Sequence, residues 1–140
     1  MRIAVDAMGG DSAPSEIVKG AVNAARKFSD HEILLVGDRD RVQDELNKAG
    51  SSPSNISIVH ASQVVSMSES ATVAVRKKID SSVTKSIELV AEKKADAMVS
   101  AGNTGATVAA ATLFLRTLEG VKRPGIAVSI PTLHGVCLVI

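Results

Sequence analysis

The sequence predicts an α/β fold in which a mostly parallel sheet is covered by helices on both faces. Two observations lead to this fold class. Short apolar runs alternate with segments in which apolar residues recur at helical spacing, as in repeated strand–helix–strand units. With 140 residues, of which 45% are hydrophobic and 22% charged, the chain also has the size and composition of one globular domain.

The first strand is expected at residues 3–5, a short apolar run that ends at a glycine-containing loop. A helix should follow, because Ser12 and Pro14 are common residue types at helix starts. Its predicted buried face consists of residues at helical spacing: Ile17, Ala21, Ala25 and Phe28.

The alternation of strand and helix continues to residue 59. Residues 32–36 form a second apolar run and predict the second strand. A helix is marked by Val42 and Leu46, and Gly50 is expected to end it. Residues 51–54 are expected to form a loop, and the alternating, β-branched segment 56–59 predicts the third strand.

The middle of the chain predicts two further helices and a strand. Residues 72–78 fit a short helix, and Ser81 and Ser82 precede a clear helical pattern at residues 83–91. Residues 96–100 predict the fourth strand. The helix after that strand is expected to run to residue 118, before Gly120 and Pro124.

The end of the chain predicts two more strands. Residues 126–130 fit a fifth strand that Pro131 breaks, and residues 136–140 fit the start of a sixth. Cys137, the single cysteine, is expected to be a buried strand residue and not a nucleophile. Because a buried strand rarely ends a domain without a polar tail, we expect the chain to be part of a larger domain.

Composition and charge argue against several classes of function. A net charge of +1 and the absence of Trp and Tyr give no basis for nucleic-acid binding. The longest apolar stretch, residues 106–115, is shorter than the roughly 20 residues that cross a bilayer. No metal site is expected, because the three histidines lack ligand spacing: His31, His60 and His134.

A glycine loop at residues 99–106 is the strongest candidate for a binding site. It joins a predicted strand to a helix, whose free N–H groups and positive dipole end suit phosphate or another small anion. The polar and glycine residues of this loop are Ser100, Gly102, Asn103, Thr104 and Gly105. The alternative is that the glycines only form a turn and that Asn103 or Thr104 only caps the helix. The loop matches neither the Walker A motif nor the dinucleotide fingerprint.

Another glycine loop follows the first strand. Its candidate residues are Asp6, Gly9, Gly10 and Asp11. Because ligands of parallel sheets bind at the carboxyl ends of the strands, we expect both loops to lie at one edge of the molecule. Asp6 and Asp11 are expected to organise the turn through backbone hydrogen bonds, since two lone carboxylates are weak evidence for a metal site.

Several motifs share their order and approximate spacing with one known family. They are residues 5–11, Val36-Gly37, Val75-Arg76, Ser81-Ser82, residues 100–106 and Arg123-Pro124. In these motifs the chain resembles the bacterial phosphate acyltransferase (PlsX) family. The resemblance implies an enzyme that moves a long-chain fatty acyl group from acyl carrier protein to inorganic phosphate, giving acyl phosphate for phospholipid synthesis without a cofactor.

The resemblance also implies an architecture and a setting. The fold is expected to be a three-layer α/β/α sandwich, similar to isocitrate dehydrogenases and phosphotransacetylases. The family acts as a homodimer in the cytoplasm, with peripheral association with the membrane. Its members are more than twice as long, so residues 1–140 are expected to be the N-terminal part of a single α/β domain. The essential active-site residues of the family are expected in the absent second half.

The chemistry of this transfer, in which phosphate must be held still to attack a thioester, gives individual residues expected roles. Backbone N–H groups of residues 102–105 are expected to hold phosphate, with Asn103 and Thr104 assisting. Arg76 is a candidate for a bidentate phosphate contact, or a solvated charge beside its lysine neighbours. Ser81 and Ser82 are candidate ligands, although helix capping is the favoured interpretation.

Two other functions remain open. A non-catalytic α/β module that binds an anion or acyl carrier protein would bind tightly without turnover. A dinucleotide-dependent oxidoreductase rests only on the sheet pattern, and failure to bind nicotinamide cofactors would exclude it.

Overall fold

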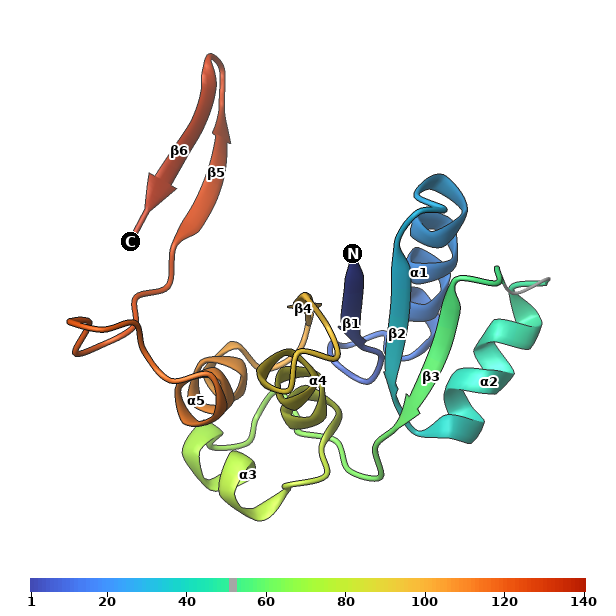
Figure 1. Ribbon diagram of the computed structural model, residues 1–140, viewed down its shortest axis with the longest axis horizontal. Coiled ribbons are helices and arrows are strands. Elements are labelled where there is room, and N and C mark those ends of the chain that lie inside the picture. Colours follow the sequence, from blue (N-terminus) through green and yellow to red (C-terminus); the bar gives the residue numbers. More distant parts are fainter. Residues whose placement is uncertain (51–52) are drawn as a thin grey trace.

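A computed structural model describes residues 1–50 and 53–140 (Figure 1). A four-stranded, fully parallel sheet has the order β3-β2-β1-β4. Its strands are β1 (Arg2–Asp6), β2 (Glu32–Gly37), β3 (Ile56–His60) and β4 (Ala97–Val99). The α/β class and the first four predicted strands are confirmed. Of the loop predicted at residues 51–54, the first two residues lie outside the described residues.

Two helices cover one face of the sheet. They are α1 (Ser15–Lys27) and α2 (Arg39–Lys48), and Figure 1 shows them on the same side of β1 to β3. Ile33 and Leu35 of β2 point into this layer, where they pack with Val22 and Leu46. The alternation of side chains along a strand sends Leu34 to the opposite face.

Three helices form the layer on the other face. They are α3 (Ala71–Lys77), α4 (Ser82–Ala91) and α5 (Thr104–Phe114). Leu89 of α4 packs on Ala4 and Leu34 of the sheet. Ala106 and Ala110 of α5 are fully buried where they pack among residues of α3 and α4, so these contacts hold α5 in the layer. The result is three layers, with the sheet in the middle.

The first helix differs from its prediction at one end. Ala21 and Ala25 are buried as expected, but Phe28 is 48% exposed. Phe28 is the C-cap residue of α1 and its backbone angles are no longer helical, so its side chain does not continue the buried face. Its ring stacks on His31 instead, with 6.1 Å between ring centroids.

The predictions for the end of the chain are only partly correct. The helix α5 ends at Phe114 and not at residue 118, because Arg116 adopts a left-handed φ of 64° just after the C-cap. The two last strands, β5 (Val128–Thr132) and β6 (Gly135–Val139), pair antiparallel with each other and do not join the parallel sheet. Figure 1 shows this hairpin projecting away from the three layers.

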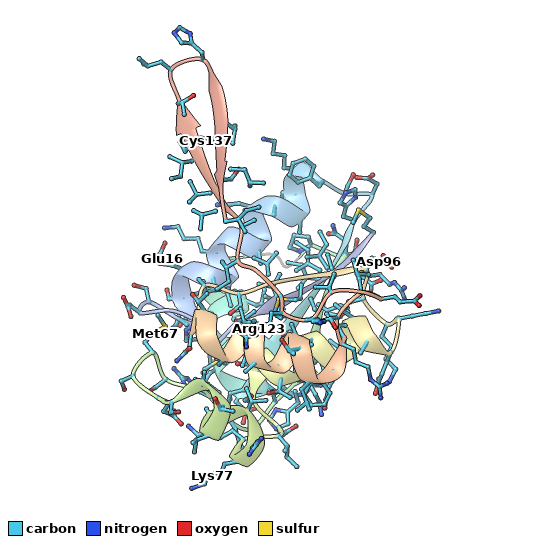
Figure 2. All side chains as sticks on the ribbon, turned by 90° about the vertical axis from the view of Figure 1, so that its left-hand side faces the viewer. Glu16, Met67, Lys77, Asp96, Arg123 and Cys137 are labelled. Atoms are coloured by element: carbon cyan, nitrogen blue, oxygen red, sulfur yellow. The ribbon has the colours of Figure 1, made fainter. Side chains whose placement is uncertain are left out.

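Two residue-level expectations for the hairpin are wrong. Pro131 lies inside β5 and does not break it, because each strand of a two-stranded hairpin has a free edge that tolerates proline. Cys137 is exposed and not buried, since every residue of β5 and β6 is exposed and none of the described elements covers the hairpin (Figure 2).

Candidate functional site

The two glycine loops lie side by side at the carboxyl edge of the sheet. β1 and β4 are neighbours in register, with Val5 opposite Val99, so the first glycine loop (residues 7–11) and the second (residues 100–105) leave adjacent strands together. This confirms the predicted common edge. Figure 2 shows Met67, which contacts this edge, and Asp96, which precedes β4, at opposite sides of the molecule.

Asp6 joins the two loops. The Ser100 hydroxyl donates a 2.7 Å hydrogen bond to Asp6 Oδ2, and the Gly102 N–H donates to the Ser100 oxygen at 3.0 Å. The Met8 N–H donates to Asp6 Oδ1 at 3.2 Å. Asp6 is only 2% exposed, so this carboxylate exchanges its water contacts for hydrogen bonds to both loops. Its expected role in organising the turn is confirmed.

The backbones of the two loops touch where glycines meet. A Cβ atom added at Gly9 would lie 2.6 Å from Asp6 Oδ2 and 2.8 Å from the Gly102 nitrogen. Gly10 adopts a φ of +105°, a conformation that residues with a side chain rarely take. The glycines of the first loop are therefore required by this close approach. Asp11 lies beyond them as an exposed residue.

Asn103 is the N-cap of α5 and also holds a neighbouring segment. Its Oδ1 accepts a 3.0 Å hydrogen bond from the Ala106 N–H. Its Nδ2 lies 3.2 Å from the carbonyl oxygen of Ser66, 3.3 Å from that of Met67 and 3.1 Å from that of Glu69. Both ends of this amide therefore have protein partners. Asn103 positions the loop, and its side chain is already committed to these contacts.

Thr104 and Gly105 form the open part of the edge. Both residues are exposed, and they occupy the first two positions of α5. N–H groups at these positions have no intrahelical acceptor, because no residue lies four positions earlier in the helix. Within residues 1–50 and 53–140 neither N–H group has a hydrogen-bond partner, so both are donors available at the positive end of the helix dipole.

Arg76, Ser81 and Ser82 lie away from the glycine loops. Arg76 is exposed and lines a groove of about 360 Å³ between α3 and the second half of α5, beside Leu113. Ser81 is buried and caps α4, accepting a 3.4 Å hydrogen bond from the Thr84 N–H. Ser82 is buried in the first turn of that helix. The favoured interpretation of Ser81 as a helix cap is confirmed.

Sequence reasoning missed Arg41. This residue lines a pocket of about 400 Å³ together with Gly10 and Asp11 of the first glycine loop. It belongs to the first turn of α2, which follows β2, so its place at the carboxyl edge follows from the topology of the sheet. Its position shortly after the second predicted strand was the signal in the sequence that could have identified Arg41.

Charged residues around the segment that Asn103 holds are paired. Glu69 lies 2.6 Å from the Lys78 ammonium group, which lowers the pKa of the Glu69 carboxyl. Hydrogen bonds from the hydroxyl and backbone N–H of Ser62, followed by that from Lys85, lower the pKa of Asp80 to about 2. These pairs fix the chain between β3 and α4.

Within residues 1–50 and 53–140, no three His, Cys, Asp or Glu side chains are grouped so as to hold a metal ion. In the same ranges, no helix has both the length and the apolar character needed to cross a membrane.

Comparison with known proteins assigns the family. The model of the fatty acid synthesis protein family matches residues 1–140. The chain belongs to this family. Relatives of the chain are named phosphate acyltransferase, which agrees with the family predicted from the motifs.

The relatives are similar along the whole chain. Phosphate acyltransferase of Geotalea daltonii is 53% identical over 140 residues, which are 100% of this chain and 40% of the relative. The Trichlorobacter lovleyi protein is 52% identical with the same coverage. The Halothermothrix orenii protein is 47% identical over 140 residues, or 42% of its length. The chain thus spans about 40% of the length of these relatives.

Proposed function

We propose that the protein containing this chain transfers a long-chain fatty acyl group from acyl carrier protein to inorganic phosphate. Acyl phosphate for phospholipid synthesis would be the product. The observation that carries the proposal is the open start of α5, held beside the first glycine loop by Asp6 and Ser100. The names of the relatives support the acyl transfer and the phosphate.

The chemistry fits this edge of the sheet. An oxygen of hydrogen phosphate attacks the thioester carbonyl carbon, the C–S bond breaks, and the carrier sulfur leaves as a thiolate that takes up the proton of the phosphate. Attack is faster when the phosphate is held still and when N–H donors face the developing negative charge. The free N–H groups of Thr104 and Gly105 are such donors, and the helix dipole favours the anion.

Other residues are proposed to act by positioning these donors. Ser100, Gly102 and Asn103 shape the second glycine loop, whereas Asp6, Gly9 and Gly10 support it from the adjacent strand. These hydrogen bonds join protein groups to one another, so they fix the loop backbone that carries the donors. Such preorganisation favours catalysis.

The proposal includes a wider setting that rests on the resemblance to the family. The 140 residues are proposed as the N-terminal part of one α/β domain, and the whole protein as a cytoplasmic homodimer that associates peripherally with the membrane. Size-exclusion chromatography with light scattering tests the dimer. Sedimentation with phospholipid vesicles tests the membrane association.

The enzymatic proposal is tested with the gene product that contains these residues. It is incubated with a long-chain acyl thioester of acyl carrier protein and radiolabelled phosphate, and label in acyl phosphate is measured. Formation of labelled acyl phosphate that requires both substrates supports the proposal. Binding of acyl carrier protein with no labelled product would favour a non-catalytic binding module instead.

A further inference from the structure

A pocket beside the glycine loops contains an arginine that the motifs did not single out. The pocket has a volume of about 400 Å³, and Gly10 and Asp11 of the first glycine loop form part of its lining. Ser66 and Ser68, which precede α3, form another part, and Arg41 of α2 adds the charge. Because Asn103 donates to the Ser66 carbonyl oxygen, the pocket lies next to the start of α5.

The Arg41 side chain is available for a ligand. Its backbone N–H donates to the Asp38 side chain, but within residues 1–50 and 53–140 its guanidinium forms no hydrogen bond or ion pair. Asp11 lines the same pocket without pairing with it. By contrast, Lys78 and Lys85 already contact carboxylates. Among the residues described as lining the pocket, Arg41 is the only cation.

We propose that this pocket is a phosphate subsite and that Arg41 is its charged contact. The inference rests on the proposed acyl transfer to phosphate and names a residue for it. A guanidinium presents two parallel N–H donors that match two phosphate oxygens, and it keeps its charge at every physiological pH. The Ser66 and Ser68 side chains add hydroxyl groups to the lining, and Asp11 can accept a hydrogen bond from a protonated phosphate oxygen.

The size of the pocket allows two sources of that phosphate. Small-molecule sites typically measure roughly 300–1,000 Å³, so a pocket of about 400 Å³ accepts more than one phosphate group. The ligand is either inorganic phosphate or the phosphate of the 4′-phosphopantetheine arm, through which acyl carrier protein holds the thioester. Both place a phosphate beside the start of α5, and they are distinguished by separate probes.

The experiment measures binding by calorimetry with the gene product that contains this chain. The probes are inorganic phosphate and 4′-phosphopantetheine, and the variants are Arg41→Gln and Arg41→Lys. Arg39→Gln is the matched control, because Arg39 lies in the same helical turn but donates to the Ile58 carbonyl oxygen. Circular dichroism shows that each variant is folded.

Loss of one charge-assisted contact is expected to weaken binding of at least one probe by roughly ten- to a hundredfold in Arg41→Gln. Arg41→Lys should lose less, and Arg39→Gln should bind like wild type. The probe whose binding is weakened in Arg41→Gln identifies the source of the phosphate. Wild-type protein that binds neither probe, or Arg41→Gln that binds both like wild type, would overturn the inference.

Parallel assays of acyl phosphate formation separate this inference from the proposed function. If the protein is active but Arg41→Gln binds phosphate like wild type, only the proposed subsite is contradicted. An inactive protein whose phosphate binding depends on Arg41 contradicts only the acyl transfer.

Discussion

The Ser100 hydroxyl donates a 2.7 Å hydrogen bond to Asp6 Oδ2, although the two residues are 94 positions apart in the sequence. The bond links the end of β1 to the loop after β4. It is continued by the Gly102 N–H, which donates to the same Ser100 oxygen. The geometry of the second glycine loop therefore depends on a buried carboxylate in a different strand.

Replacing Ser100 by alanine should destabilise the protein. Asp6 would lose a hydrogen bond while remaining buried, and the Gly102 N–H would lose its acceptor. We expect the free energy of unfolding to fall by about 1–3 kcal/mol, as measured by urea denaturation. Ser29→Ala, at an exposed position, is the control and should change it by less than about 0.5 kcal/mol. Equal stability of the two variants would contradict the proposed link between the loops.

Gly9→Ala should be destabilising because there is no room for a methyl group. The added Cβ would lie within 2.6 Å of Asp6 Oδ2. Overpacking of this kind typically lowers the free energy of unfolding by about 1–3 kcal/mol. The matched control is Gly20→Ala in α1, where a Cβ meets nothing within 4 Å and helix propensity predicts a gain of about 0.5–1 kcal/mol. Thermal unfolding of both variants should shift in opposite directions, and a shift in the same direction refutes the steric argument.

Asn103 can be separated into its two roles. Aspartate is as good an N-cap as asparagine, but in Asn103→Asp a carboxylate oxygen would face the carbonyl oxygens of Ser66 and Met67. We therefore expect Asn103→Asp to lower the free energy of unfolding and to speed hydrogen exchange in residues 66–69. The control is Asp38→Asn at the N-cap of α2, which should change the free energy of unfolding by no more than about 0.5 kcal/mol. If Asn103→Asp and Asp38→Asn change the free energy of unfolding equally, Asn103 acts only as a helix cap.

Asp80 should make stability depend on acid pH. Its pKa in the folded protein is lowered from 3.8 to about 2, so the folded state favours the charged carboxylate. The stabilisation is therefore fully present above the unfolded pKa and is lost as the pH falls through the folded pKa. Urea unfolding from about pH 5 to about pH 2 should show a shallower loss of stability in Asp80→Asn than in wild type. Parallel pH profiles would contradict the assignment.

Local sequence patterns were sufficient for the repeated strand–helix units and for the shared edge of the two loops. Apolar runs followed by glycine place β1 and β4 correctly, and a parallel sheet brings their carboxyl ends together. The hairpin at the end was mistaken for parallel strands because an apolar run looks the same in either setting. Only the strand's partner distinguishes them, and that partner is set by tertiary structure.

The candidate site was harder to predict in its details. Asn103 was recognised as a cap, but its contacts with the segment before α3 join residues more than 30 positions apart. Arg76 belongs to one of the family motifs, but it lines the groove between α3 and α5. Arg41 belongs to no motif, yet it lines the pocket at the carboxyl edge of the sheet. A surface arginine acquires such a position only through the packing of α2 on the sheet.

The most direct measurement of the central claim is the KM for phosphate in acyl phosphate formation by Thr104→Pro and Thr104→Ala. Proline is favoured at the first position of a helix, and the extended backbone of Asn103 suits a following proline, so the fold should persist. Thr104→Pro removes a free N–H donor, whereas Thr104→Ala retains it. If the start of α5 holds phosphate, KM should rise roughly tenfold or more in Thr104→Pro and remain near the wild-type value in Thr104→Ala. A wild-type KM in a folded Thr104→Pro variant would contradict the account.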